Sequence, residues 1–335
     1  MPAPPVFIVG CPRSGTTLLR RLLERHPALA ICGETQFHLL VYVRRKAFGN
    51  LENPAKRAHL IREYLASRPM RESGLDTSEL RDRLAREATS YQALFTSILS
   101  YYADSQNKPR CGEKTALHAL FLETLREWFP GALILHMVRD PRAVVASLQG
   151  APWASSSVVT NTRKWIKLNQ AARQFHDQPG YLEVRYEALV QSPAGELQKI
   201  CSFLGEEYSP GMLVPDQNRA AGGDSLRRWQ MAITPERVDA WKTELTAAQV
   251  AQIEWVLGSK MESFGYERSA PSASALTVLR GLTDAAIDFA GHAITRSLPF
   301  LWYQVAAPTK IEKSDYRWGP KRSREGANRR AQEGT

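Results

Sequence analysis

The chain has 335 residues, of which 43% are apolar and 23% charged, a globular composition that argues against general disorder. Lysine and arginine number 44 against 34 aspartates and glutamates, and the net charge of +10 favours an anionic partner such as a nucleotide, a sulfate or phosphate ester, nucleic acid or a membrane surface. No stretch approaches the roughly 20 apolar residues of a transmembrane helix, and we expect no signal peptide. The four cysteines form no C-x-x-C pair, so we expect a cytoplasmic protein without a metal site.

The first part of the chain is expected to form a strand, a glycine-rich turn and a helix. The short apolar run Val6–Gly10 is bounded by prolines and a glycine, which is typical of a buried strand. Apolar pairs at helical spacing in residues 18–23 predict the helix. The residues that follow are largely polar and arginine-rich, with helix-like stretches broken by prolines and a glycine, and they predict a helical insert over 45–110.

Two further strand–helix units are predicted in the middle of the chain. Residues 132–138 form a second apolar run, and the helix predicted at 142–148 begins after Asp140, whose side chain suits the N-cap position. Residues 181–186 predict a third strand, and an amphipathic helix is predicted at 194–204. Because strands alternate with helices, we predict an α/β fold with a P-loop-like parallel sheet flanked by helices.

The composition changes near the C-terminus. Residues 1–268 are predicted to form the main domain, and 269–309 a helical extension with an amphipathic helix at 275–297. The basic tail at 310–335 is predicted to be disordered. Peripheral contact with an anionic membrane through 275–330 is one hypothesis, which would place the protein at the inner face of the membrane. The alternative is that the helix packs on the protein's own core or on a second subunit.

The strongest motif is Gly-Cys-Pro-Arg-Ser-Gly-Thr-Thr at residues 10–17. It lies between the first predicted strand and helix, where backbone N–H groups and the helix dipole attract an anion. Nucleoside-triphosphate loops follow G-x-x-x-x-G-K-S/T, but here Thr16 stands at the lysine position and the cation is Arg13 inside the loop. The second predicted strand ends in Arg139, a further anion-binding cation. These residues predict a site for a phosphate-bearing donor without a tightly held metal.

At these residues the sequence resembles the sulfotransferases that use 3′-phosphoadenosine 5′-phosphosulfate (PAPS). Residues 12–17 are similar to that family's 5′-phosphosulfate loop, and Cys-Gly-Glu at 32–34 resembles the tyrosylprotein sulfotransferases. Residues 132–147 look like the family's 3′-phosphate motif, and 184–190 look like a later strand with its Arg-Tyr-Glu continuation. The resemblance implies that residues 1–268 are a sulfotransferase catalytic domain.

The resemblance also implies roles for individual residues. Glu34 would be the general base and Lys114 would stabilise the transferring group, with Arg13 as a further catalytic cation. The residues implied to hold the donor are Arg13, Ser14, Gly15, Thr16 and Thr17 at the 5′-phosphosulfate, Arg139 and Ser147 at the 3′-phosphate, and Tyr186 near the adenosine. His38 and His118 are alternative bases, because histidine is the commonest general base.

The implied reaction is a single in-line displacement without a metal, in which the acceptor hydroxyl loses its proton to the base. The acceptor is expected to be a glycan, a glycolipid, a small metabolite or a tyrosine. Cys32 precedes Glu34 by two residues and Cys111 precedes Lys114 by three, so the two thiols are expected to be near neighbours if both groups face one cleft.

Two other classes of protein are weighed against this interpretation. A P-loop kinase using ATP and magnesium is the alternative enzyme, although the loop lacks its lysine. Net charge alone suggests nucleic-acid binding, but no binding motif accompanies it, and we expect no nucleic-acid partner.

Overall fold

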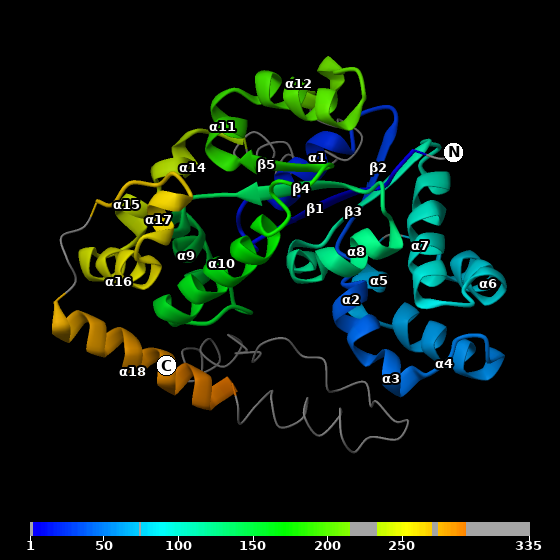
Figure 1. Ribbon diagram of the computed structural model, residues 1–335, viewed down its shortest axis with the longest axis horizontal. Helices are drawn as coiled ribbons and strands as arrows, with labels where there is room; N and C mark the ends of the chain where they lie inside the picture. The colour runs from blue at the N-terminus through cyan, green and yellow to red at the C-terminus, as the bar shows by residue number, and fades with distance from the viewer. Residues whose placement is uncertain (1–2, 74, 215–232, 270–273, 293–335) are drawn as a thin grey trace, which may run out of the picture.

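The computed structural model describes residues 3–73, 75–214, 233–269 and 274–292. Its centre is a five-stranded parallel sheet with the strand order β2-β3-β1-β4-β5 (Figure 1). The strands are β1 (Val6–Gly10), β2 (Leu29–Cys32), β3 (Arg110–Lys114), β4 (Leu133–Val138) and β5 (Tyr181–Arg185). The predicted α/β class with a parallel sheet is confirmed.

Helices cover both faces of this sheet, as parallel strands joined by crossover connections require. In β1, Phe7 and Val9 belong to one buried apolar cluster, whereas Val6 and Ile8 belong to the other. The helices that contribute to the cluster of Val6 and Ile8 are α1 (Thr16–Leu23), α11 (Tyr186–Gln191) and α12 (Pro193–Leu204). The helices that contribute to the cluster of Phe7 and Val9 include α8 (Leu122–Trp128), α9 (Pro141–Gln149) and α10 (Val158–Arg173).

The segment between β2 and β3 is helical from Phe37 to Ser105, where the sequence predicts a helical insert over 45–110. Its elements are α2 (Phe37–Leu40), the 3-10 turn η1 (Tyr42–Arg44), α3 (Arg45–Phe48), α4 (Pro54–Leu65), α5 (Arg68–Glu72), α6 (Thr77–Glu87) and α7 (Tyr91–Ser105). Asn53, Asp76 and Ser90 cap α4, α6 and α7 by accepting hydrogen bonds from the first backbone amides of those helices. Helix α7 packs against β2 and β3 and joins the insert to the sheet.

Strands β2 and β3 are the two strands of the sheet that the sequence pattern did not predict, and helices α8 and α10 were not predicted either. Strand β3 reads Arg-Cys-Gly-Glu-Lys, so three of its five residues carry charges and no apolar run marks it. The charged side chains of Arg110, Glu113 and Lys114 are nevertheless buried. Arg110 meets Glu206 at 3.0 Å and two backbone carbonyls, and this pairing offsets the loss of hydration. The remaining connections include the 3-10 turns η2 (Ala116–Phe121) and η3 (Pro210–Leu213).

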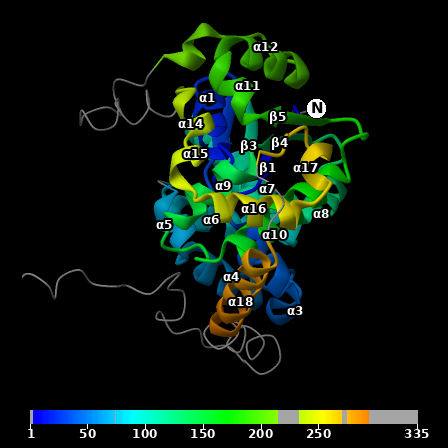
Figure 2. The same ribbon diagram turned by 90° about the vertical axis from the view of Figure 1, so that its left-hand side faces the viewer.

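The C-terminal part of the described chain is helical. Its helices are α14 (Glu236–Asp239), α15 (Trp241–Glu244), α16 (Ala247–Leu257), α17 (Lys260–Ser263) and α18 (Ala275–His292). Helix α18 packs on α10 and α16 and lies at the opposite end of the molecule from α12 (Figure 2). The predictions for 293–335, including the basic tail, and for the linker residues 270–273 lie outside the described residues.

Helix α18 packs through a different face from the apolar stripe that the sequence predicts. Gly281 and Ala285 are buried, and Gly281 lies close to Gln252 and Val159. The stripe residues Leu276 and Leu279 are 69% and 59% exposed. The helix therefore contacts the protein's own core, as one alternative proposed, but with its leucines turned to solvent. Among the described residues, no helix is long and apolar enough to cross a membrane.

Gly112 in β3 occupies a position where an added methyl group would collide with the sheet. A Cβ atom there would lie 2.6 Å from the carbonyl oxygen of Val6 and 2.6 Å from Cδ1 of Ile31. Gly112→Ala is expected to lower the free energy of unfolding by about 1–3 kcal/mol, because the neighbouring strand is fixed by its own ladder. Thermal unfolding measures this, with Gly33→Ala as the control, since nothing lies within 4 Å of an added Cβ there. Equal melting temperatures for the two variants would contradict the expected overpacking.

Candidate active site

The loop between β1 and α1 has the geometry of an anion-binding turn. Gly10 and Gly15 have φ angles of 149° and 97°, in the region that favours glycine. Gly15 is the N-cap of α1, so no side chain caps the first amides of that helix. A Cβ on Gly15 would lie 2.5 Å from the Tyr186 ring, and one on Gly10 would lie 2.4 Å from the Met137 carbonyl oxygen. The two glycines allow the loop to pack tightly against the ends of β4 and β5.

Arg13 projects from this loop in a strained conformation. Its φ of 74° is unusual for a residue other than glycine and costs on the order of 1 kcal/mol. Its Nε donates a hydrogen bond to Ser147 Oγ in α9 at 2.8 Å. Arg13 and Ser147 are therefore in contact, although the family resemblance implies that Arg13 holds the 5′-phosphosulfate and Ser147 the 3′-phosphate.

Arg139 lies at the end of β4, almost fully buried beside the same loop. Its guanidinium donates to the carbonyl oxygens of Arg13 at 3.1 Å and Arg237 at 2.7 Å, and lies 4.1 Å from the centre of the Tyr186 ring. Burial lowers the pKa of Arg139, which means that its charge is poorly solvated. Its Nε is buried without a hydrogen-bond partner among the described residues, and so is Ser14 Oγ in the loop. Unsatisfied buried donors of this kind are suited to an anion.

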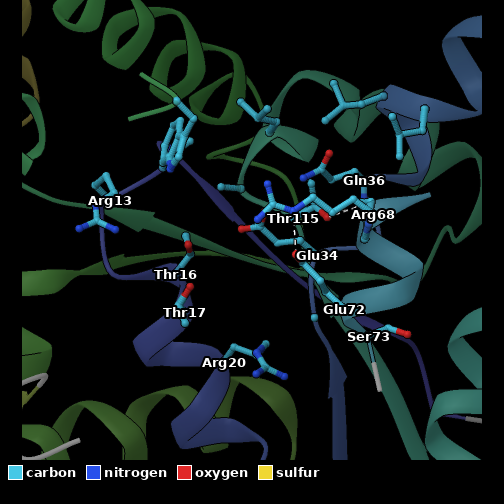
Figure 3. A pocket seen from close by; sticks show the side chains of 18 of the residues that line it. Arg13, Thr16, Thr17, Arg20, Glu34, Gln36, Arg68, Glu72, Ser73 and Thr115 are labelled. Atoms are coloured by element: carbon cyan, nitrogen blue, oxygen red, sulfur yellow. Dashed lines mark hydrogen bonds and ion pairs between the residues drawn. The ribbon is translucent and has the colours of Figure 1, made fainter. Parts of the chain in front are cut away.

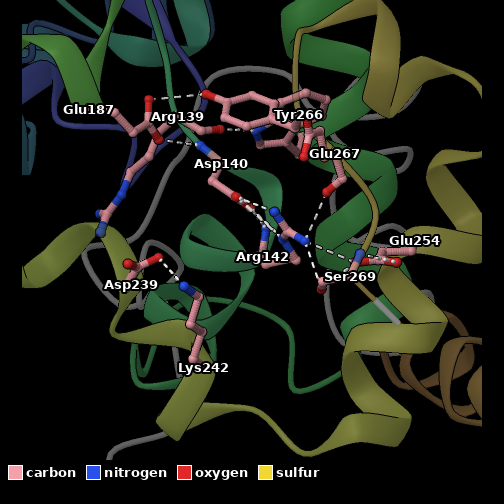
Figure 4. A network of polar contacts seen from close by, with 11 residues as sticks. Arg139, Asp140, Arg142, Glu187, Asp239, Lys242, Glu254, Tyr266, Glu267 and Ser269 are labelled. Atoms are coloured by element: carbon pink, nitrogen blue, oxygen red, sulfur yellow. Dashed lines mark hydrogen bonds and ion pairs between the residues drawn. The ribbon is translucent and has the colours of Figure 1, made fainter. Parts of the chain in front are cut away.

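A network of polar contacts fixes the backbone directly after Arg139 (Figure 4). Glu187 accepts hydrogen bonds from the backbone N–H of Asp140 at 2.8 Å and from the Tyr266 hydroxyl at 3.2 Å. Asp140 caps α9 and pairs with Arg142, which also contacts Glu254 in α16 at 2.9 Å. The predicted N-cap role of Asp140 is confirmed.

Glu34 and Lys114 meet at the ends of the adjacent strands β2 and β3. Lys114 Nζ lies 2.6 Å from Glu34 Oε1. The Lys114 side chain is only 5% exposed, whereas the Glu34 side chain is 44% exposed and lines a cleft together with the phosphate loop (Figure 3). Because β2 and β3 were not predicted, this juxtaposition follows from the structure and not from the sequence pattern.

The cleft has a volume of about 2130 Å³, larger than the roughly 300–1,000 Å³ of a typical small-molecule pocket. One end is formed by the phosphate loop, Arg139, Ser147 and Tyr186. The other end is formed by the insert, whose lining residues include Arg44, Phe48, Arg62, Tyr64, Arg68 and Glu72. Arg68 and Glu72 form an ion pair of 2.7 Å close to Glu34 (Figure 3). The cleft therefore extends from the phosphate loop to the helical insert, and Glu34 is among its lining residues.

Several lining residues were not identified from the sequence. They are Arg20, Gln36, Trp153, Lys164, Arg237 and Trp241. None of them belongs to a motif that the sequence identifies, although Arg20 lies in the helix that follows the phosphate loop, so the folded arrangement reveals them. The described residues contain no group of three or more His, Cys, Asp or Glu side chains placed to hold a metal ion.

The two alternative bases, His38 and His118, are buried away from solvent. The His38 ring is packed among aromatic rings, including Phe95 at 5.3 Å and His118 at 4.6 Å between centroids. Burial, with a smaller contribution from His118, lowers the pKa of His38 to about 2, so this ring is neutral. His118 Nδ1 lies 3.0 Å from Glu113 Oε2 and is fully buried.

The two thiols that were expected to be neighbours lie on adjacent strands. Cys111 pairs in register with Ala30, and Cys32 pairs with Glu113, so the cysteines are offset by two residues. Both belong to the same apolar layer, and both are free thiols. Burial raises the pKa of Cys32, which is therefore a protonated thiol.

A parallel α/β sheet with an anion-binding loop after β1, a buried arginine after β4 and a carboxylate–lysine pair beside them defines a group-transfer enzyme for an anionic donor. Residues 4–210 match the family model described as the sulfotransferase family, and the chain belongs to this family. The predicted class, a PAPS-dependent sulfotransferase, is confirmed. The kinase alternative finds no support among these matches.

Relatives and solved structures agree with this assignment. The chain is 30% identical to a candidate protein-tyrosine sulfotransferase of Caenorhabditis briggsae over 216 residues, which cover 62% of this chain and 68% of that protein. It is 27% identical to the nodulation protein NoeE of Sinorhizobium fredii, over 86% of this chain and 70% of that protein. The sulfotransferase domain of the Synechococcus olefin synthase has the same fold, with a TM-score of 0.57 and 23% identity over 79% of this chain and 96% of that domain.

Proposed function

We propose that this chain moves the sulfuryl group of PAPS to an acceptor hydroxyl, with Glu34 as the general base. The observation that carries the proposal is that Glu34, which lines the same cleft as the phosphate loop, lies 2.6 Å from the Lys114 ammonium. This pair puts a carboxylate that can accept a proton next to a cation that can stabilise negative charge.

The donor end of the cleft would hold the two phosphate groups of PAPS. The amides at the start of α1, the Arg13 side chain, and Thr16 and Thr17 line the cleft and would contact the 5′-phosphosulfate. Ser14, which is buried within the loop and does not line the cleft, would contribute its hydroxyl from beneath. Arg139 and Ser147 would contact the 3′-phosphate, and Tyr186 would lie beside the adenosine. Ser14 Oγ and Arg139 Nε support this fit, because both are buried without an acceptor in the described part of the chain and each would gain one.

In the transfer step, the acceptor oxygen forms a bond to sulfur while the bond from sulfur to the bridging phosphate oxygen breaks. The proton of the acceptor hydroxyl goes to Glu34, and the electron pair of the broken bond stays on the departing phosphate. Protonation of Glu34 removes its charge from Lys114, so the ammonium becomes available for the leaving oxygen. Arg13 adds a second cation on the donor side, and catalysis rests on positioning and electrostatics without a metal.

The acceptor is proposed to be an extended hydroxyl compound: a glycan, a glycolipid or a tyrosine peptide rather than a small metabolite. The volume of the cleft supports this choice, because it exceeds what the donor alone would fill. A cytoplasmic location is part of the same proposal, and so is peripheral membrane contact through 275–330. The exposed Leu276 and Leu279 support membrane contact.

Transfer of label from radiolabelled PAPS tests this function. The acceptor probes are a tyrosine peptide, chitotetraose and 2-naphthol, each assayed with EDTA, and water is the acceptor present in every reaction. We expect label in at least one organic probe without magnesium. A protein that leaves all labelled PAPS unchanged but phosphorylates a probe from ATP and magnesium would overturn the proposal.

Ser14→Ala separates donor binding from stability. The Ser14 hydroxyl is buried and has no partner in the described ranges, so its removal is expected to leave the melting temperature unchanged or slightly raised. The affinity for 3′-phosphoadenosine 5′-phosphate (PAP) is expected to fall by about 10-fold, since a hydrogen bond to a charged group is lost. Calorimetric titration and thermal unfolding check the two effects. A lower melting temperature with unchanged affinity would show that the hydroxyl serves the fold instead.

A further inference from the structure

Glu113 is a buried carboxylate that the proposed reaction does not use. It is 1% exposed and lies in β3, directly before Lys114. Its Oε1 accepts hydrogen bonds from the backbone N–H and the hydroxyl of Thr35, both at 3.0 Å, and from the Thr115 hydroxyl. Its Oε2 lies 3.0 Å from Nδ1 of His118. Burial raises the pKa of the Glu113 carboxyl, but the His118 ring and these hydrogen bonds lower it by more. The net pKa is therefore below its usual value, and the group is ionised.

The partners of Glu113 flank the two proposed catalytic groups. Thr35 follows Glu34 in the loop after β2, and Thr115 follows Lys114 at the end of β3. Thr115 Oγ1 also accepts a hydrogen bond from the backbone N–H of Gln36 at 3.2 Å. The Glu113 carboxylate therefore connects the loop after β2, which carries Glu34, to the end of β3, which carries Lys114.

The loop after Glu34 is strained and needs such contacts. Gln36 has a φ of 49°, a left-handed conformation that costs on the order of 1 kcal/mol for a residue other than glycine. The contacts that hold this turn are the hydrogen bonds from Thr35 to Glu113, from Gln36 to Thr115, and from the Tyr64 hydroxyl to the Thr35 carbonyl oxygen at 3.0 Å. A non-glycine residue keeps such a conformation only where its surroundings over-determine it.

We infer that Glu113 is a positioning residue for sulfuryl transfer, which holds the turn at 34–36 so that the Glu34 carboxylate faces the acceptor. The inference rests on the proposed function of Glu34 as the base. Glu113 touches neither donor nor acceptor, because its carboxylate is buried beneath the loop. Its loss is expected to misplace Glu34 by a fraction of an ångström, an error to which transfer rates are sensitive.

The test is a double-mutant cycle between Glu113→Gln and Glu34→Gln. The readout is kcat for transfer from radiolabelled PAPS to the tyrosine peptide or to chitotetraose, whichever accepts label, and to water if neither does, with KM for PAPS and the melting temperature measured alongside. Glu113→Gln keeps the side-chain volume and one acceptor oxygen but removes the charge. Glu183→Gln is the matched control, because that carboxylate forms a partly buried ion pair with Arg173 at 2.7 Å in the edge strand β5.

We expect Glu113→Gln to lower kcat by about 10- to 100-fold with KM for PAPS unchanged. In the Glu34→Gln background it should have almost no further effect, because residues that act as a unit are non-additive. Glu183→Gln should lose stability and keep kcat. Thr35→Val should behave like Glu113→Gln, and Thr35→Ser, which retains the hydroxyl, should restore the rate.

Two different failures can be told apart. If Glu34→Gln transfers as fast as the unchanged protein, the base assignment fails, and any positioning through Glu34 fails with it. If Glu34→Gln is slow but Glu113→Gln lowers the rate of both backgrounds by the same factor, Glu34 remains the base and the positioning role is overturned. A loss of kcat in Glu183→Gln equal to that in Glu113→Gln would assign the effect to stability alone.

Discussion

Replacement of Glu34 with glutamine is expected to lower kcat for sulfuryl transfer by about a thousandfold, within the range for removal of a general base. Glutamine has nearly the same shape but cannot accept the proton of the acceptor hydroxyl. It also leaves Lys114 without its carboxylate at 2.6 Å, so the PAP affinity should be kept or slightly raised. Initial rates with radiolabelled PAPS and calorimetric titration with PAP measure the two quantities separately.

The control for this prediction is Glu262→Gln. Glu262 is 52% exposed and pairs with Arg268 at 2.7 Å, which matches the exposure and ion pairing of Glu34 at a position outside the cleft. Its replacement should leave kcat unchanged. A Glu34→Gln enzyme that retains more than about a tenth of the rate would mean that another group removes the proton, since base catalysis is worth at least about a hundredfold.

Replacement of Arg139 with alanine is expected to weaken PAP binding by at least about a hundredfold. The Arg139 Nε lacks a hydrogen-bond partner among the described residues and would donate a charge-assisted hydrogen bond to phosphate. Removing one partner of such a buried charged pair weakens the binding free energy by about 2–5 kcal/mol. Arg139→Lys keeps the charge but loses the planar fork, so we expect an intermediate affinity. Calorimetric titration with PAP measures the affinity of the unchanged protein, Arg139→Lys and Arg139→Ala, which we expect to decrease in that order.

Thermal unfolding shows whether Arg139→Ala damages the fold instead of the site. The side chain donates to the carbonyl oxygens of Arg13 and Arg237, so some loss of stability is expected. Arg173→Ala is the comparison, because Arg173 also bridges a backbone carbonyl and an aromatic ring, at Ser263 and Phe264, without lining the cleft. Equal PAP affinities for both variants would contradict the role of Arg139 at the donor.

The sequence predicts the parts of this fold that have a simple hydrophobic pattern. Strands β1 and β4 are apolar runs next to turns, and β5 carries Tyr, Leu and Val beside Glu183 and Arg185. The structure confirms these three strands within about one residue. The phosphate loop also follows from its local sequence, because glycines with positive φ and a helix start are short-range features. Arg139 and Asp140 fall where the end of an apolar strand and an N-cap place them.

Two features could not be predicted, because they depend on contacts between distant residues. Strand β3 buries Glu113 and Lys114, and only the neighbouring strand and loop supply the partners that make this burial possible. The roles proposed for Glu34 and Lys114 therefore came from family resemblance, while their contact came from the structure. In α18, periodicity indicates a helix with an apolar face, but the small residues Gly281 and Ala285 decide which face packs.

The most direct test of the whole account is calorimetric titration of the unchanged protein with PAP, in EDTA and in magnesium, beside ATP under the same conditions. We predict micromolar binding of PAP that does not depend on magnesium, because the site supplies arginines and backbone amides where a nucleotide kinase supplies a lysine and a metal. No binding of PAP, together with binding of ATP that requires magnesium, would contradict the donor site proposed at the phosphate loop and Arg139.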